Sequence, residues 1–76
     1  MKELAEAIIH SIVDKTDEIS VKVVESGATV VIEIKVAKSD MGKVIGKSGK
    51  MAWAIRTVLT NAGTKIKKRI IVQFLE

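Results

Sequence analysis

The chain has 76 residues, of which 47% are hydrophobic and 29% are charged, so a single globular domain over residues 1–76 is expected rather than a disordered chain. The absence of cysteine excludes disulfide bonds and cysteine-based zinc sites, and no apolar run approaches the ~18 residues that a membrane span requires. The first residues lack the character of a signal peptide. We therefore predict a cytoplasmic protein with no metal, cofactor or membrane partner.

The net charge of +4 is unevenly distributed along the chain. Residues 1–34 hold three lysines against seven acidic residues, whereas residues 35–76 hold ten basic residues against two acidic ones. A strongly basic segment attracts polyanions and speeds their association. On charge alone a solvated lysine-rich surface is the simpler interpretation, and nucleic acid is the partner that the charge pattern offers as the alternative.

Residues 3–14 are predicted to form an amphipathic helix, because Leu4, Ile8 and Ile12 recur every four residues. A second apolar row runs beside the first and consists of Ala5, Ile9 and Val13. Acidic side chains in the first turn suit the positive end of a helix. The two apolar rows give this helix one face that can be buried.

Two segments of alternating apolar and polar residues, 19–24 and 30–36, predict a β-hairpin. Residues 25–28 (Glu-Ser-Gly-Ala) predict the turn between them. Val24 and Val31 fall on the face opposite the main apolar row. That face is either ordinary surface or a weak partner surface.

A short helix is predicted at residues 41–45, with Ser39 or Asp40 as its cap and Gly42 inside it. A longer helix is predicted at residues 50–62, where the apolar residues again follow a helical period. Two residues predict the end of this helix, Asn61 and Gly63.

The last segment, residues 65–76, is predicted to be a strand. Its apolar face holds Ile66, Ile70, Val72 and Phe74, and its first residues form a basic cluster of Lys65, Lys67, Lys68 and Arg69. The expected order is helix, strand, strand, short helix, longer helix, strand. We therefore predict an α+β domain with a three-stranded sheet and helices on one face.

The most distinctive stretch is residues 44–50, which read Val-Ile-Gly-Lys-Ser-Gly-Lys. A nucleotide-binding P-loop is excluded, because it needs a glycine at position 41, where this chain has Met41, and Gly42 comes one residue too late. Between two helices, the backbone N–H groups of Gly49 and Lys50 are expected to point outward at the positive end of the second helix. Glycines let a phosphate approach the main chain closely. The simpler alternative is a glycine-rich turn with solvated lysines.

This stretch resembles the V-I-G-x-x-G signature of the KH domain, and the order of elements matches the type II version of that fold, α-β-β-α-α-β with a mixed sheet. A free-standing domain of this length is similar to the small bacterial KhpA proteins. The resemblance covers nearly the whole chain. It implies a loop at residues 46–49, called here the GxxG loop, that clamps the backbone of single-stranded RNA beside a groove for unpaired bases.

Carried over by position, the resemblance gives a set of RNA-binding residues: Lys43, Val44, Ile45, Gly46, Lys47, Ser48, Gly49, Lys50 and Ala52. Of the apolar residues near the loop, Val44, Ile45, Ala52 and Ile55 are candidates for the floor of the groove or the core beneath it. Ile34 and Val36 are candidates for its far wall. Ala52 departs from the common KH pattern, which has a larger aliphatic residue there, so we expect weak and broadly specific RNA binding.

Trp53 is expected on the surface, because it lies about 160° around the helix from Ile55. It is a candidate for base stacking, for a dimer interface or for plain surface. KhpA-like proteins dimerise and pair with a larger KH-containing partner (KhpB, also called Jag or EloR), so the resemblance implies a homodimer or such a heteromer. It also implies a post-transcriptional regulator or RNA chaperone linked to cell elongation and division.

Catalysis finds no support in the sequence. His10 is the sole histidine and lies in the acidic first helix, where a surface position is expected. Asp14 and Asp17 are close in sequence, but loop acids at this spacing are usually solvated. We therefore predict a non-catalytic RNA-binding domain, and the alternative is a KH-fold interaction module that binds little RNA.

Overall fold

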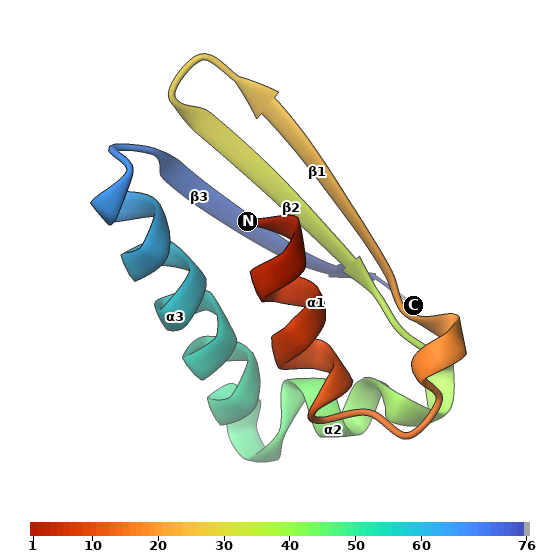
Figure 1. Cartoon of the computed structure of the whole chain (residues 1–76). Coiled ribbons are helices and arrows are strands. Elements are labelled where there is room, and N and C mark those ends of the chain that lie inside the picture. The colour runs from red at the N-terminus through yellow and green to blue at the C-terminus, as the bar shows by residue number, and fades with distance from the viewer. Residues whose placement is uncertain (76) are drawn as a thin grey trace.

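The computed structural model describes residues 1–75 and all of their side chains except that of Lys47. Three helices pack on one face of a three-stranded sheet, as predicted (Figure 1). The helices and strands are α1 (Lys2–His10), β1 (Ser20–Ser26), β2 (Thr29–Lys35), α2 (Met41–Ile45), α3 (Lys50–Lys65) and β3 (Arg69–Leu75). Short 3₁₀ turns are η1 (Thr16–Glu18), η2 (Lys38–Asp40) and η3 (Lys47–Gly49).

The sheet has β2 at its centre, paired antiparallel with β1 and parallel with β3. Val30, Ile32 and Ile34 of β2 are fully buried beneath the helices. The predicted alternation is therefore confirmed, as is the side of the strand that faces the core. On the outer face, the register places Val24, Val31 and Ile71 side by side across the three strands. This outer row is partly exposed, and Val24 keeps 46% of its surface accessible.

The first helix ends earlier than predicted, at His10 instead of residue 14. The Ser11 hydroxyl donates a hydrogen bond to the carbonyl of Ile8, and its backbone N–H is shared between the carbonyls of Ala7 and Ile8. Such side-chain back-bonding competes with regular helix continuation. Val13 is nevertheless buried, so its predicted place in the core holds although it lies outside the helix.

The long helix α3 runs to Lys65, so the prediction that Asn61 and Gly63 would stop it is wrong. Gly63 lies inside the helix and is buried. A β-carbon there would lie 2.2 Å from Cγ1 of Ile70, so this glycine permits close packing of α3 on β3 instead of ending the helix. The last strand accordingly begins at Arg69 rather than Lys65.

The residues between α3 and β3 also differ from expectation. Ile66 was predicted on the buried face of the last strand, but it is the C-cap residue of α3 and is 54% exposed. Four buried residues that form the centre of the core come from α1, β2 and α3: Ile9, Ile32, Ile55 and Leu59. The core thus ties the first helix to the central strand and to the long helix of the crossover between β2 and β3.

Candidate nucleic-acid interface

The GxxG loop joins the end of α2 to the start of α3, at the end of the molecule away from the β1–β2 turn (Figure 1). The backbone N–H of Gly46 donates to the carbonyl of Gly42 and closes α2 at 2.9 Å. Gly46 then takes φ 70° and ψ −177°, a backbone region that is essentially restricted to glycine. Ser48 and Gly49 follow in the left-handed region, with φ of 55° and 75°. The loop is therefore a tight reversal with positive φ at three of its four positions.

The two glycines of the loop are needed for different reasons. A β-carbon at Gly46 would lie 2.6 Å from Cβ of Met51 and 3.0 Å from the Met51 backbone nitrogen, in the first turn of α3. A β-carbon at Gly49 would meet nothing within 4 Å. Gly49 is the N-cap of α3 and has no side chain to accept a hydrogen bond from the first turn. The open space at Gly49 leaves this helix start accessible to an anion.

The three lysines predicted around the loop do not share one environment. Lys50 is exposed at the start of α3. The ammonium of Lys43 contacts the carboxylates of Asp14 and Asp40, the latter at 3.8 Å. Lys47 stays a prediction, because its side chain lies outside the described part of the structure. Of the two described lysines, Lys50 is thus the one without an acidic neighbour to neutralise it.

The apolar residues near the loop separate into surface and core. Ile45 is 37% exposed, whereas Val44, Ala52 and Ile55 are buried. These three belong to the core beneath the surface, one of the two roles predicted for them. Ile34 and Val36 are also buried, so the expectation that they would form an exposed far wall of a groove is wrong. Each lies on the inner face of the sheet or just beyond the end of β2, where the helices cover it.

A family model described as "KhpA/KhpB, KH domain" matches residues 2–74. The chain belongs to this KhpA/KhpB KH-domain family. The chain is 48% identical over 75 residues to a Clostridium acetobutylicum protein named RNA-binding protein KhpA, with 99% of this chain and 100% of that protein covered. Proteins of the same name from Aquifex aeolicus (43% identity, 100% and 96% coverage) and Chlamydia trachomatis (37%, 100% and 97%) also match. No solved structure gave a significant match.

The predicted type II KH fold and the resemblance to KhpA are thereby confirmed. The match spans α1 to β3, so the GxxG loop of this KH domain stands within it at residues 46–49.

Asp40, at the start of α2, contacts the segment that follows α1 instead of capping its own helix. Asp40 is the N-cap residue of α2, but its side chain caps nothing, in contrast to the prediction. Its two oxygens instead accept the backbone N–H groups of Asp14 at 3.2 Å and Lys15 at 2.9 Å. Asp40 is buried, and Lys43 contacts both it and Asp14. This Asp40–Lys43–Asp14 cluster fastens the segment after α1 to the helix that carries the loop.

The charges of this cluster stabilise one another. The hydrogen bond from the Lys15 backbone, that from Asp14 and the nearby ammonium of Lys43 lower the pKa of Asp40 below its ordinary value of 3.8, although desolvation opposes them. The hydrogen bond to Asp14 and the charges of both acids raise the pKa of Lys43. Sequence reasoning missed the contacts that Asp14 and Lys15 make with Asp40 and Lys43, because these contacts span 25 to 29 residues, whereas the Asp40–Lys43 pair is local, three residues apart.

Substituting Asp40 by asparagine should lower stability at neutral pH and flatten its dependence on acid. A group whose pKa is lower in the folded state stabilises the fold above about pH 3.8, and this contribution is lost as pH falls through the folded pKa. Asparagine also presents an N–H group to one of the two backbone donors. Urea midpoints from pH 7 to pH 2 measure both effects. Asp17→Asn removes an exposed acid from the neighbouring η1 turn and should leave the profile unchanged; an equal change in both variants would contradict the role given to Asp40.

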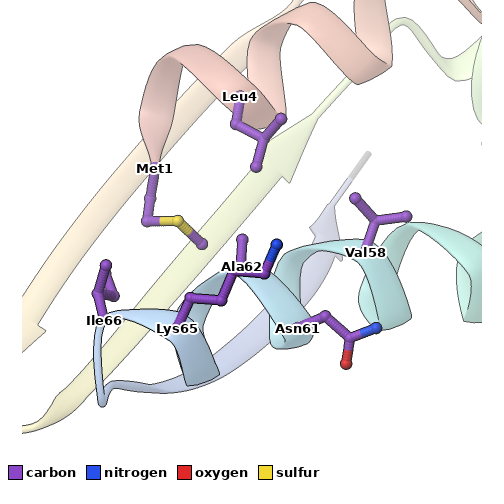
Figure 2. Close-up of a pocket in the computed structure, with 7 residues that line it drawn as sticks. All are labelled: Met1, Leu4, Val58, Asn61, Ala62, Lys65 and Ile66. Atoms are coloured by element: carbon purple, nitrogen blue, oxygen red, sulfur yellow. The ribbon is translucent and has the colours of Figure 1, made fainter.

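Trp53 lies on the surface of α3 and is 69% exposed, as predicted. A second apolar surface of α3 includes Val58, which is 48% exposed and about 140° around the helix from Trp53. Val58 lies in an open groove of about 630 Å³ between α1 and α3 (Figure 2). The groove is lined by Met1, Leu4, Val58, Asn61, Ala62, Lys65 and Ile66. Trp53 and the groove are thus two separate surfaces of this KH domain.

The remaining candidate groups do not assemble into a reactive site in the described part of the chain. His10 is exposed, and no three His, Asp or Glu side chains among those described are placed to hold a metal ion. Asp14 is exposed, as predicted, and its carboxylate also contacts the ammonium of Lys43. Within residues 1–75, every helix is too short or too polar to cross a membrane.

Proposed function

We propose that this KH domain binds single-stranded RNA without catalysis, with the GxxG loop as the clamp on the sugar-phosphate backbone. The observation that carries the proposal is the loop itself, whose positive φ angles and missing β-carbons leave the start of α3 open beside an exposed Lys50. Relatives named RNA-binding protein KhpA support the same partner. Lys47 and Ser48 would contact phosphate, Ile45 would meet a base, and the buried Val44 and Ala52 would support this surface from the core.

The double variant Lys47→Asp, Ser48→Asp tests the clamp. Negative charge at both central positions should repel phosphate and abolish retention of single-stranded RNA in a filter or gel-shift assay at about 0.1 M salt. The loop's two glycines are unchanged, so circular dichroism should report an intact fold. The matched control Lys22→Asp, Ser20→Asp makes the same change of charge on exposed residues of β1 and should retain RNA. If the loop variant binds as well as the parent, the clamp is wrong.

Self-association is the second candidate function, and two exposed surfaces of α3 favour it. Trp53 is one, and the groove that contains Val58 and Leu4 is the other. The family resemblance supports a homodimer, or a heteromer with a larger KhpB-type protein, in a cytoplasmic regulator or RNA chaperone of cell elongation. Aromatic side chains exposed in this way are frequent at the centres of interfaces.

The variants Trp53→Glu and Val58→Glu test which of these two surfaces forms a dimer interface. If Trp53 lies in a dimer interface, its replacement by glutamate should reduce the mass measured by light scattering to that of one 8.3 kDa chain. Val58→Glu is the matched variant on the other flank of the same helix. Loss of the dimer in Val58→Glu alone would assign the interface to the groove, and an unchanged mass in both would remove this function from α3.

A further inference from the structure

The turn between α3 and β3 places a lysine in a backbone conformation that favours glycine. The N–H of Lys68 donates to the carbonyl of Gly63 at 2.8 Å, and that of Lys67 donates to the carbonyl of Thr64 at 3.1 Å. This is the hydrogen-bond pattern of a Schellman motif, whose left-handed position is usually glycine. Here that position is Lys67, with φ of 59°. A charged residue thus occupies a backbone conformation in which glycine would be more stable.

The strained turn is also the centre of a basic cluster. Lys65, Lys67 and Arg69 are exposed, and within residues 1–75 none of the three forms an ion pair. Lys68 differs, because its ammonium contacts Glu25 and donates to the carbonyl of Gly27 at 3.2 Å. Three cations without acidic neighbours therefore remain in a span of five residues.

Hydrogen bonds fix the backbone that carries the cluster. The backbone N–H of Arg69 donates to the carbonyl of Ala28 at 2.7 Å, and Lys68 joins the same hairpin turn. The turn is therefore fastened at both ends, to α3 by its capping bonds and to the β1–β2 hairpin by these two contacts. A preorganised surface of this kind binds with a smaller entropy cost than a mobile loop.

The two basic regions lie at opposite ends of one helix (Figure 1). With 16 residues, α3 separates the GxxG loop from the α3–β3 turn by about 24 Å. A KH clamp holds about four nucleotides, so a longer strand leaving the loop has phosphates available for a second contact. Both ends carry the same sign of charge, which suits one continuous polyanion.

We propose that Lys65, Lys67 and Arg69 form a second contact site for the phosphate backbone of the same RNA strand. The inference rests on RNA binding at the GxxG loop and adds the route of the strand beyond it. Phosphate neutralisation carries no base specificity, so this site strengthens binding to any sufficiently long single strand. An acidic protein is the competing partner, and it is distinguished in the test.

The test uses Lys67→Gly, because the proposal predicts opposite changes in stability and binding. Glycine relieves the strain at φ 59°, so the melting temperature should rise by about 5 °C. Removal of one phosphate contact should reduce the salt slope of log K for a single-stranded RNA of about 16 nucleotides by about 0.7. Binding of an RNA of about four nucleotides, followed by NMR, should not change. Asparagine also tolerates this φ, so Lys67→Asn replaces the glycine variant in the test if that variant does not fold.

A triple variant, Lys65→Gln, Lys67→Gly, Arg69→Gln, enlarges the effect. Its salt slope on the longer RNA should fall by about 2 and its affinity by about tenfold, while the four-nucleotide RNA binds as before. Lys22→Gln removes an exposed lysine from β1 and should leave the slope unchanged.

Each outcome separates the two proposals. The second site is wrong if the triple variant loses affinity equally for both RNA lengths, or if its salt slope of log K is unchanged. Either result leaves the clamp at the GxxG loop standing. Failure of the parent protein to bind either RNA overturns the clamp itself. If the triple variant keeps RNA binding but loses a protein partner, the cluster is a protein contact and this inference is wrong.

Discussion

Replacing Gly46 by alanine should lower the free energy of unfolding by about 3 kcal/mol, a large part of the roughly 4 to 11 kcal/mol expected for a domain of this size. Two costs act together at this position. The new β-carbon would stand 2.6 Å from Cβ of Met51, and φ of 70° with ψ of −177° is unfavourable for any residue with a side chain. The first turn of α3 must move to accept it, and the GxxG loop moves with it.

Urea denaturation measures this loss as a fall of about 3 M in the midpoint, with a slope near 1 kcal/mol/M. Two neighbouring glycines provide a graded control. Gly49→Ala has the unfavourable φ but open space, so it should cost about 1 kcal/mol. Gly42→Ala lies inside α2 with open space, so it should stabilise by up to about 1 kcal/mol. Equal losses at Gly46 and Gly49 would show that the contact with Met51 is unimportant.

Gly63→Ala is the second substitution with a large expected effect. Alanine inside an exposed helix normally stabilises by up to about 1 kcal/mol relative to glycine. At Gly63 the added β-carbon would lie 2.2 Å from Cγ1 of Ile70 and 3.0 Å from the carbonyl oxygen of Lys68. We therefore expect a loss of about 3 kcal/mol instead, because α3 must separate from β3.

A double-mutant cycle with Ile70→Ala isolates this contact. Removing the Ile70 side chain costs about 3 kcal/mol by itself, since Ile70 is buried. It also removes the atoms that the β-carbon added by Gly63→Ala would strike, so the double variant should be about 2 kcal/mol more stable than the sum of the single losses. Thermal or urea unfolding of the four proteins gives the coupling. Additive losses would mean that the backbone of Lys68, rather than Ile70, limits the site.

The order and type of the elements were predictable because each depends on local periodicity. Alternation at residues 19–24 and 30–36 indicated the hairpin, and spacing of three and four residues indicated the helices. The element ends were less predictable. Gly63 has the identity of a helix stop, yet its position against Ile70 makes it a packing residue, and only the tertiary contact distinguishes the two.

In the candidate site, too, local features could be predicted from the sequence and contacts between distant residues could not. The GxxG loop is a contiguous motif, so its position between two helices followed from the sequence. The pairing of Lys43 with Asp14, and the hydrogen bonds of Asp40 to the segment after α1, join residues distant in the chain. No local pattern marks such contacts. Sequence reasoning therefore placed Lys43 with the phosphate-binding lysines, whereas the structure places it among acids.

The parallel pairing of β2 with β3 has a consequence for the order of folding. The crossover between these strands spans residues 36–68 and contains α2, the GxxG loop and α3. Non-local pairing of this kind is slow, because the entropy of closing a long segment is lost before the contacts between the strands form. During synthesis β3 is made after every other strand and helix of the domain. We therefore expect a nascent chain that still lacks β3 to hold RNA poorly, and the clamp to reach its final shape only when the sheet is complete.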